Sequence, residues 1–189
     1  MTRKGILASA AVAAALIAAV GTTSASSDDD HGGRRSRRLK ADLKGFSEVP
    51  AISTAARGSF RAVLSEDESE IEYRLDYSDL QGTVLQSHIH VGAHHTNGGI
   101  SVWLCGNPST TPPIITPPAG TPTCGAPGGV GPEAWGTLTT TNVIGPAGQL
   151  VAAGEFAELV RAIKAGVTYA NVHTTAVPSG EIRGQIKVD

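Results

Sequence analysis

Apolar and polar residues alternate along much of the chain, and this period of two is the main structural signal in the sequence. It is clearest where Ile71, Tyr73, Leu75 and Tyr77 are separated by charged residues. Alternation predicts a β-strand with one buried and one solvated face, because successive side chains on a strand point to opposite sides. The strands predicted in this way cover residues 39–44, 58–64, 70–77, 84–91, 100–105, 135–139, 167–173 and 181–188.

One segment follows the helical period instead. Phe156, Leu159, Val160 and Ile163 recur at positions i, i+3, i+4 and i+7, and Gly166 follows as a stop signal. This pattern predicts a short helix over about 155–165 whose apolar stripe packs against the strands. About eight short strands with turn-rich joints and one helix predict an all-β domain, either an antiparallel sandwich or a barrel.

The N-terminal segment has the composition of an export signal. Arg3 and Lys4 precede a charge-free, alanine-rich run over residues 5–20, and small residues follow at 23–25. The run is too short to cross about 30 Å of hydrocarbon comfortably, so a cleaved signal peptide is favoured over an uncleaved membrane anchor. We therefore predict a signal peptide at residues 1–25, no membrane span after its cleavage, and a secreted or extracytoplasmic protein in the periplasm or cell envelope.

The remaining chain is expected to form a leader and one domain. Residues 26–38 join an acidic block to an arginine-rich block, which predicts a disordered charged leader. Residues 39–189 have the length of one domain. Eight of the eleven prolines lie in a predicted surface insertion at about 106–134. The net charge of −2 argues against nucleic acid as a general partner.

The two cysteines, Cys105 and Cys124, both lie in the part expected to be exported. An oxidising compartment favours their pairing as a disulfide. Such a bridge would stabilise the fold by about 3 kcal/mol if unstrained. A zinc or redox pair is less consistent with the spacing, because the C-x-x-C pattern is absent.

The candidate chemistry of the chain is concentrated in residues 87–95, which hold four of its six histidines. His88 and His90 are two positions apart on a predicted strand, so their side chains share a face, while Ile89 and Val91 point to the core. Two imidazoles in this arrangement can act as adjacent ligands to zinc or copper.

A third nitrogen ligand is available from His173, His94 or His95, and His173 lies in a second polar strand. The nearby carboxylates are expected to be those of Glu48 and Glu181. The alternative interpretation is structural: the histidines hydrogen bond to carboxylates and backbone groups at a polar strand junction. Sequence alone leaves both interpretations open.

Recognisable catalytic motifs are absent from the sequence. It contains no G-x-S-x-G nucleophile elbow, no H-E-x-x-H metalloprotease motif and no P-loop. Its aromatic residues are too sparse to form a platform for stacked bases. We therefore predict a protein that is not an enzyme.

An ordered set of short motifs resembles the CHRD domain, a module first described in chordin and also found singly in exported bacterial proteins. The resemblance runs from about Leu39 to the C-terminus. It rests on Leu43–Pro50, Ile71–Leu75, Ser87–Gly92 with Asn97–Gly98, Ala162–Gly166, Tyr169–Thr174 and Pro178–Gln185. The resemblance implies an immunoglobulin-like Greek-key arrangement of the strands. Chordin's growth-factor ligands do not carry over, because cysteine-rich modules accompany its CHRD domains.

The resemblance also implies that Glu48, Asn171, Glu181 and Arg183 form a polar network with the histidines, which can fix strand order. A weaker likeness is to copper/zinc superoxide dismutase, whose further histidines and aspartate this chain lacks.

Two functional hypotheses follow. The first is an exported, non-catalytic domain that binds an extracytoplasmic protein or envelope component, or serves the envelope structurally, without a cofactor. The second is a copper- or zinc-binding protein with His88, His90 and His173 as ligands and a dismutase-like redox role.

Overall fold

The structure is a computed structural model that describes residues 36–125 and 133–189. The predicted signal peptide, residues 26–35 of the predicted leader and residues 126–132 of the predicted insertion lie outside the described residues. Within the part of the chain that the structure describes, no helix combines the length and apolar character needed to cross a bilayer.

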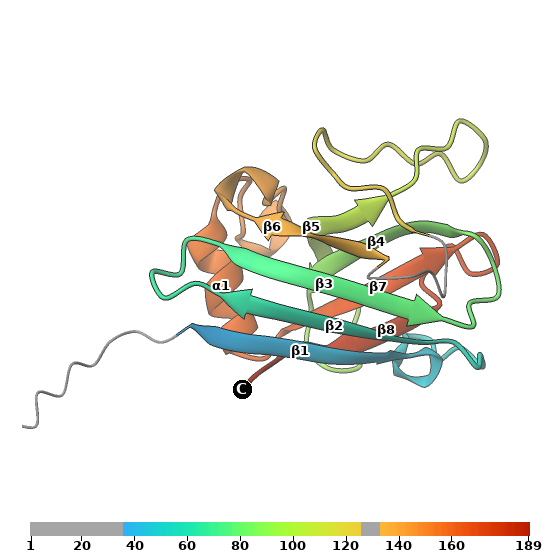
Figure 1. Ribbon diagram of the computed structural model, residues 1–189, viewed down its shortest axis with the longest axis horizontal. Coiled ribbons are helices and arrows are strands. Elements are labelled where there is room, and N and C mark those ends of the chain that lie inside the picture. Colours follow the sequence, from blue (N-terminus) through green and yellow to red (C-terminus); the bar gives the residue numbers. More distant parts are fainter. Residues whose placement is uncertain (1–35, 126–132) are drawn as a thin grey trace, which may run out of the picture. The chain divides into compact units, whose positions relative to one another are not determined.

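The described chain is all-β apart from one α-helix and three short 3-10 turns, as the alternating pattern predicted (Figure 1). The strands are β1 (Arg37–Lys44), β2 (Arg57–Leu64), β3 (Ile71–Ser78), β4 (Val84–Val91), β5 (Gly99–Gly106), β6 (Ala134–Leu138), β7 (Thr168–Thr174), β8 (Ile182–Gln185) and β9 (Lys187–Val188). The helix is α1 (Phe156–Lys164), and the 3-10 turns are η1 (Gly45–Ser47), η2 (Thr140–Asn142) and η3 (Ala147–Gln149).

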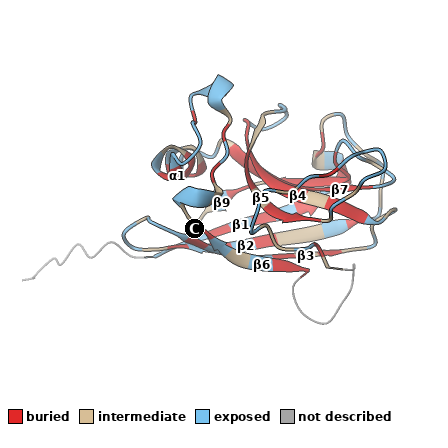
Figure 2. Cartoon of the chain, turned by 90° about the horizontal axis from the view of Figure 1, so that it is seen from above, coloured by how far each residue is buried: buried red, intermediate tan, exposed pale blue. Residues whose placement is uncertain are grey.

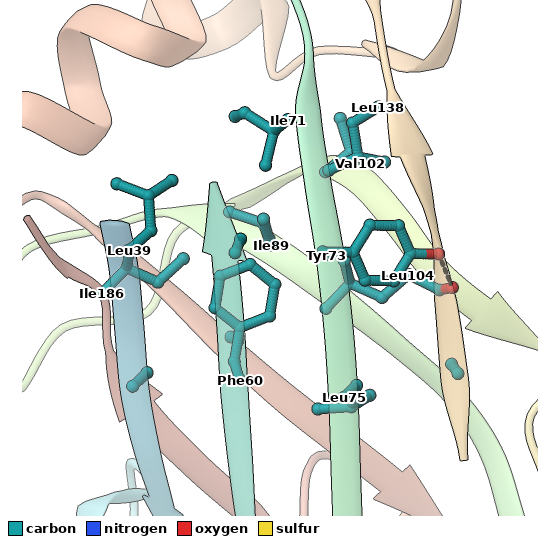
Figure 3. Packing of buried hydrophobic residues seen from close by; sticks show 14 of the residues in the cluster. Leu39, Phe60, Ile71, Tyr73, Leu75, Ile89, Val102, Leu104, Leu138 and Ile186 are labelled. Carbon is teal, nitrogen blue, oxygen red and sulfur yellow. Dashed lines mark hydrogen bonds between the residues drawn. The ribbon is translucent and has the colours of Figure 1, made fainter. Parts of the chain in front are cut away.

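All strand pairs are antiparallel, in the order β5-β4-β7-β8-β1-β2-β3-β6, with β9 added beside β1. The sheet curls so that its two end strands, β5 and β6, approach each other. The Tyr73 hydroxyl on β3 donates to the Leu104 carbonyl on β5 at 2.5 Å, across this narrow gap (Figure 3). The result is a nearly closed barrel; the immunoglobulin-like Greek-key connection stays a prediction.

The barrel interior is filled by the inward residues of the alternating strands. On β3, Ile71, Tyr73, Leu75 and Tyr77 are all buried, as the sequence pattern predicted. They belong to one core cluster with Phe60 of β2 and the inward side chains of the other strands, and Figure 3 shows Ile71, Tyr73 and Leu75 within it. Because large aromatic side chains are few, the core depends mainly on leucine, isoleucine, valine and alanine.

Helix α1 forms where the helical spacing of apolar residues predicted it. Phe156, Leu159, Val160 and Ile163 are buried and belong to the main core. It ends in a Schellman motif, because the Gly166 and Val167 amides donate to carbonyls of the last turn and Gly166 has φ of 72°. Glycine adopts this left-handed conformation without a steric penalty.

The C-terminal segment differs from its prediction. Residues 181–188 were expected to form one strand, whereas β8 and β9 are separated at Ile186. The Ile186 side chain is fully buried and its amide donates to the Thr168 carbonyl at 2.9 Å. The chain thus leaves β1 at this point in order to bury an apolar side chain.

The proline-rich segment is tied to the barrel as the sequence predicted. Cys105 on β5 and Cys124 form a disulfide with Cα atoms 5.0 Å apart. The side chain of Asn107 adds three hydrogen bonds beside it, two from its amide to the carbonyls of Val84 and Cys124 and one accepted from the Cys124 amide. The described part of the insertion is therefore held at its two ends.

Candidate functional site

The outer face of β4 and β7 is polar but buried. Alternation directs Ile89 and Val172 into the core and leaves His88, His90 and His173 on the opposite face. Loops cover that face, so both strands are buried on both sides (Figure 2). The exposed fractions of the three histidines are only 0%, 7% and 7%.

These three histidines come together in space although His173 follows His90 by 83 positions in the sequence. One ring nitrogen from each lies within 4.8 Å of the others. Nδ1 of His88 and Nε2 of His173 lie 3.3 Å apart. Two nitrogens that bind one zinc ion at about 2.0–2.1 Å lie at most about 4.2 Å apart. The widest pair in the cluster would therefore have to close by a few tenths of an ångström for one cation to contact all three imidazoles.

Two backbone carbonyls orient the histidine rings. Nδ1 of His90 lies 2.9 Å from the Gly98 carbonyl, and Nδ1 of His173 lies 3.0 Å from the Pro178 carbonyl. A carbonyl oxygen only accepts, so each Nδ1 carries the proton and each Nε2 keeps a lone pair. Histidines that bind metals are commonly fixed through their other nitrogen in this way.

Burial keeps the imidazoles neutral. Desolvation, with smaller effects from His173 and His90, lowers the pKa of His88 to about 2. Desolvation also lowers the pKa of His90 to about 4, and it lowers the pKa of His173. At pH 7 the cluster therefore offers uncharged nitrogen donors, which is the protonation state that metal binding requires.

Unpartnered acceptors gather on the same face. Among the described residues, six buried side-chain polar atoms have no hydrogen-bond partner, and four belong here: Nε2 of His88, Nε2 of His90, Oε1 of Glu48 and Oδ1 of Asn171. Glu48 and Asn171 meet at Gly180, where an added Cβ would lie 2.6 Å from Glu48 Oε1 and 3.2 Å from Asn171 Nδ2. Burial raises the pKa of Glu48 to about 7, against the opposing charge of Arg183.

The two predicted carboxylates occupy different places. Glu181 is fully buried, and its carboxylate accepts hydrogen bonds from the Thr54 hydroxyl, the backbone N–H of Gln81 and the Thr174 hydroxyl at 2.7–2.9 Å. It joins three chain segments and makes no hydrogen bond to an imidazole. Glu48 likewise has none, so the three histidines are not paired with a carboxylate in the described chain.

Arg183 supports the histidine cluster from the side. Its guanidinium lies 3.3 Å from the centre of the Tyr169 ring, and that ring stacks in parallel on His90 at 4.7 Å. The same guanidinium donates to the carbonyls of Thr96 and Ala93 and to the side chain of Asn97. Arg183 therefore holds the 92–98 loop, which supplies the Gly98 carbonyl to His90.

Sequence reasoning missed Tyr169 and Trp103 as neighbours of the site. Tyr169 is two positions before Asn171, so strand alternation alone places it on the histidine face. The Trp103 ring lies 4.3 Å from that of His88, but a register shift in the β4–β5 pairing produces this contact. Nothing in the sequence indicated that shift.

The other candidate ligands lie elsewhere. His94 and His95 are exposed in the 92–98 loop and contact each other, with ring centres 4.0 Å apart. Neither belongs to the three-histidine group. Of the three residues considered as a third ligand, His173 is the one that the fold brings to His88 and His90.

Together, the barrel and its buried histidine face define a small antiparallel β domain with a preformed polar site. The chain belongs to the CHRD domain family, whose model matches residues 39–186. CHRD domains form a non-enzymatic family that is extracellular in general. No curated protein and no solved structure matches this chain.

Proposed function

We propose that this CHRD domain is an exported, non-catalytic binding domain of the cell envelope whose three-histidine site holds one copper or zinc ion. The main observation in favour of a bound metal is that Nε2 of His90 and Nε2 of His173 each keep a lone pair. Each belongs to a ring whose other nitrogen is already fixed by a backbone carbonyl. The partner of the domain is an extracytoplasmic protein or envelope component.

The gathered acceptors support a cation rather than a purely structural network. Burying polar atoms without partners costs about 1–3 kcal/mol each. Hydrogen-bonded networks avoid this cost by matching donors to acceptors, as Glu181 does with its three donors. At the histidine cluster, the unpartnered Nε2 of His90 and Oδ1 of Asn171 are both acceptors, and a bound cation would supply the missing partner of a nitrogen lone pair.

The experiment compares metal content in matched histidine variants of the exported protein. The protein is stripped with a chelator, reconstituted with Zn²⁺ or Cu²⁺ in phosphate-free buffer, desalted and analysed for metal. Native protein should retain about one ion per chain. His90→Gln and His173→Gln should lose it, while the His94→Ala/His95→Ala double variant retains it, because those two histidines are exposed and separate from the group.

Circular dichroism and thermal unfolding of the metal-free variants show whether each still folds. Fluorescence gives an independent signal, because Trp103 contacts His88 and bound Cu²⁺ should quench it; Trp103→Phe should remove most of the quenching. Native protein without stoichiometric metal, or equal metal content in folded His90→Gln protein, would refute the metal proposal. A dismutase assay on the copper-loaded protein separates a redox role from simple binding.

A further inference from the structure

A second candidate site lies at the seam between β1 and the C-terminal strands, and none of the three clustered histidines lines it. On the edge of β1 that faces β8 and β9, Lys44 pairs with β8, and Leu39 and Lys40 pair with β9. Residues 41–43 pair with neither β8 nor β9. At Gly184 the backbones of β1 and β8 still approach closely, because an added Cβ would lie 2.4 Å from the Asp42 carbonyl oxygen. The interrupted ladder leaves a hollow bounded by backbone and outward side chains.

The hollow is a cavity of about 260 Å³ whose lining is strongly basic. Lys40, Lys44, Lys187 and His94 line it together with the Ser47 hydroxyl, and Asp42 is its one acidic side chain. Its volume lies just below the usual range of about 300–1,000 Å³ for small-molecule sites. A cavity of this size has room for one small ion or for one charged group of a larger ligand.

The side chains of two of these lysines are not held in an ion pair, although the charge of Lys44 helps to lower the pKa of Asp42. Lys40 pairs with Asp189 at 2.6 Å, and Asp42 is engaged by Arg61 at 2.7 Å. Among the described residues, the side-chain ammonium groups of Lys44 and Lys187 make neither a hydrogen bond nor an ion pair within 4.0 Å. A basic pocket therefore persists in a protein whose net charge is −2, and that local excess favours an anion.

We propose that this lysine pocket binds one sulfate or phosphate group, either as a free ion or as an ester carried on a polymer. Lysine ammonium groups bind such oxyanions as mobile point charges. Lys44 and Lys187 approach from β1 and β9, and the Ser47 hydroxyl adds a neutral donor. This site is independent of the metal site and does not need it to be filled.

The test uses inorganic sulfate and dextran sulfate as probes of the two sources. Sodium sulfate is titrated into the exported protein by ¹H–¹⁵N NMR, and dextran sulfate by calorimetry, with ionic strength held constant by chloride. Saturable binding should shift the amide signals of Gly184 and Lys187. Lys44→Ala/Lys187→Ala should weaken it by about tenfold per lysine, as expected for hydrogen bonds to charged groups.

The control is Arg57→Ala/Arg161→Ala, which removes the same charge from two exposed positions outside the pocket. If sulfate binds and only the lysine variant weakens it, the site accepts the free ion. If dextran sulfate alone shows that pattern, the ligand is the polymer-borne ester. Absence of saturable binding to both probes, or equal loss in both double variants, would overturn the proposal.

Discussion

Arg183 is the residue through which the stability of the fold and the geometry of the site can be tested together. It is 2% exposed and, within residues 36–125 and 133–189, it makes no hydrogen bond to a carboxylate. We predict that Arg183→Lys, which keeps the charge but loses the planar guanidinium, destabilises the protein and weakens metal binding. Lysine cannot both lie flat on Tyr169 and reach the carbonyls of the 92–98 loop.

The magnitude follows from the contacts that are lost. The strongest hydrogen bond, to the Thr96 carbonyl at 2.7 Å, is a charged one and contributes about 1.5–3 kcal/mol. The desolvated cation–π contact with Tyr169 adds up to about 2 kcal/mol. Because lysine recovers part of these contacts, we expect a net loss of about 3 kcal/mol in the free energy of unfolding.

Urea unfolding of the metal-free protein measures this loss, and Arg61→Lys provides the matched control. Arg61 also donates to two backbone carbonyls, both at 2.9 Å, and to Asp42. Its side chain is 47% exposed, so water can replace these partners. We expect Arg61→Lys to cost less than about 1 kcal/mol.

Metal affinity distinguishes a positioning role from a merely structural one. If Arg183 fixes the loop that carries the Gly98 carbonyl, its loss should weaken metal binding by about 10–100-fold, the usual effect of losing an outer partner of a ligand. Arg61→Lys should leave metal affinity unchanged. The reasoning fails if Arg183→Lys costs no more stability than Arg61→Lys, or if its metal affinity equals that of native protein.

Three further predictions test the core, the disulfide and the buried histidines. Leu159→Ala should lower the free energy of unfolding by about 2–5 kcal/mol in urea denaturation, while Leu150→Ala, 86% exposed, should change it by less than about 0.5 kcal/mol. Thiol titration should find no free thiol in the native protein, and Cys105→Ser/Cys124→Ser should cost about 3 kcal/mol. Because the pKa of His90 is lowered to about 4 in the folded protein, the stability from its neutral form is present above pH 6.5 and is lost as the pH falls toward 4. For metal-free protein, the free energy of unfolding should therefore rise with pH between about 4 and 6.5, and this rise should be smaller in His90→Gln than in native protein by up to about 1.4 kcal/mol per pH unit. The same pH dependence in both proteins would contradict burial of a neutral imidazole.

The elements that sequence reasoning found are those whose signal is local. The apolar residues of β3 and α1 repeat with periods of 2 and 3.6, and each period depends only on which face of one element is buried. The division of residues 182–188 into β8 and β9 has no such signal. It depends on Ile186 reaching the core beside Thr168 of β7, and that neighbour is fixed only when the strands are ordered.

The histidine face shows why a polar pattern on a strand has two meanings. The order His88-Ile89-His90-Val91 predicts a strand with a solvated polar face, yet that face is buried, and the loops that follow β4 and β7 contact its histidines. Alternation identified which side chains point together. It could not show that Gly98 and Pro178 would supply the carbonyls that set the ring protons, because loop placement is a property of the whole fold.

Burial is also what gives the cluster its chemical interest. An exposed pair of imidazoles can satisfy both ring nitrogens with water, so its geometry carries little information. Here water is largely excluded, one nitrogen of His90 and one of His173 are committed to carbonyls, and the remaining lone pairs converge with that of His88. Folding leaves Nε2 of His88 and Nε2 of His90 without a hydrogen-bond partner among the described residues, at a cost of about 1–3 kcal/mol each. A bound cation offsets that cost, so metal should raise the unfolding temperature of native protein and leave that of His90→Gln unchanged.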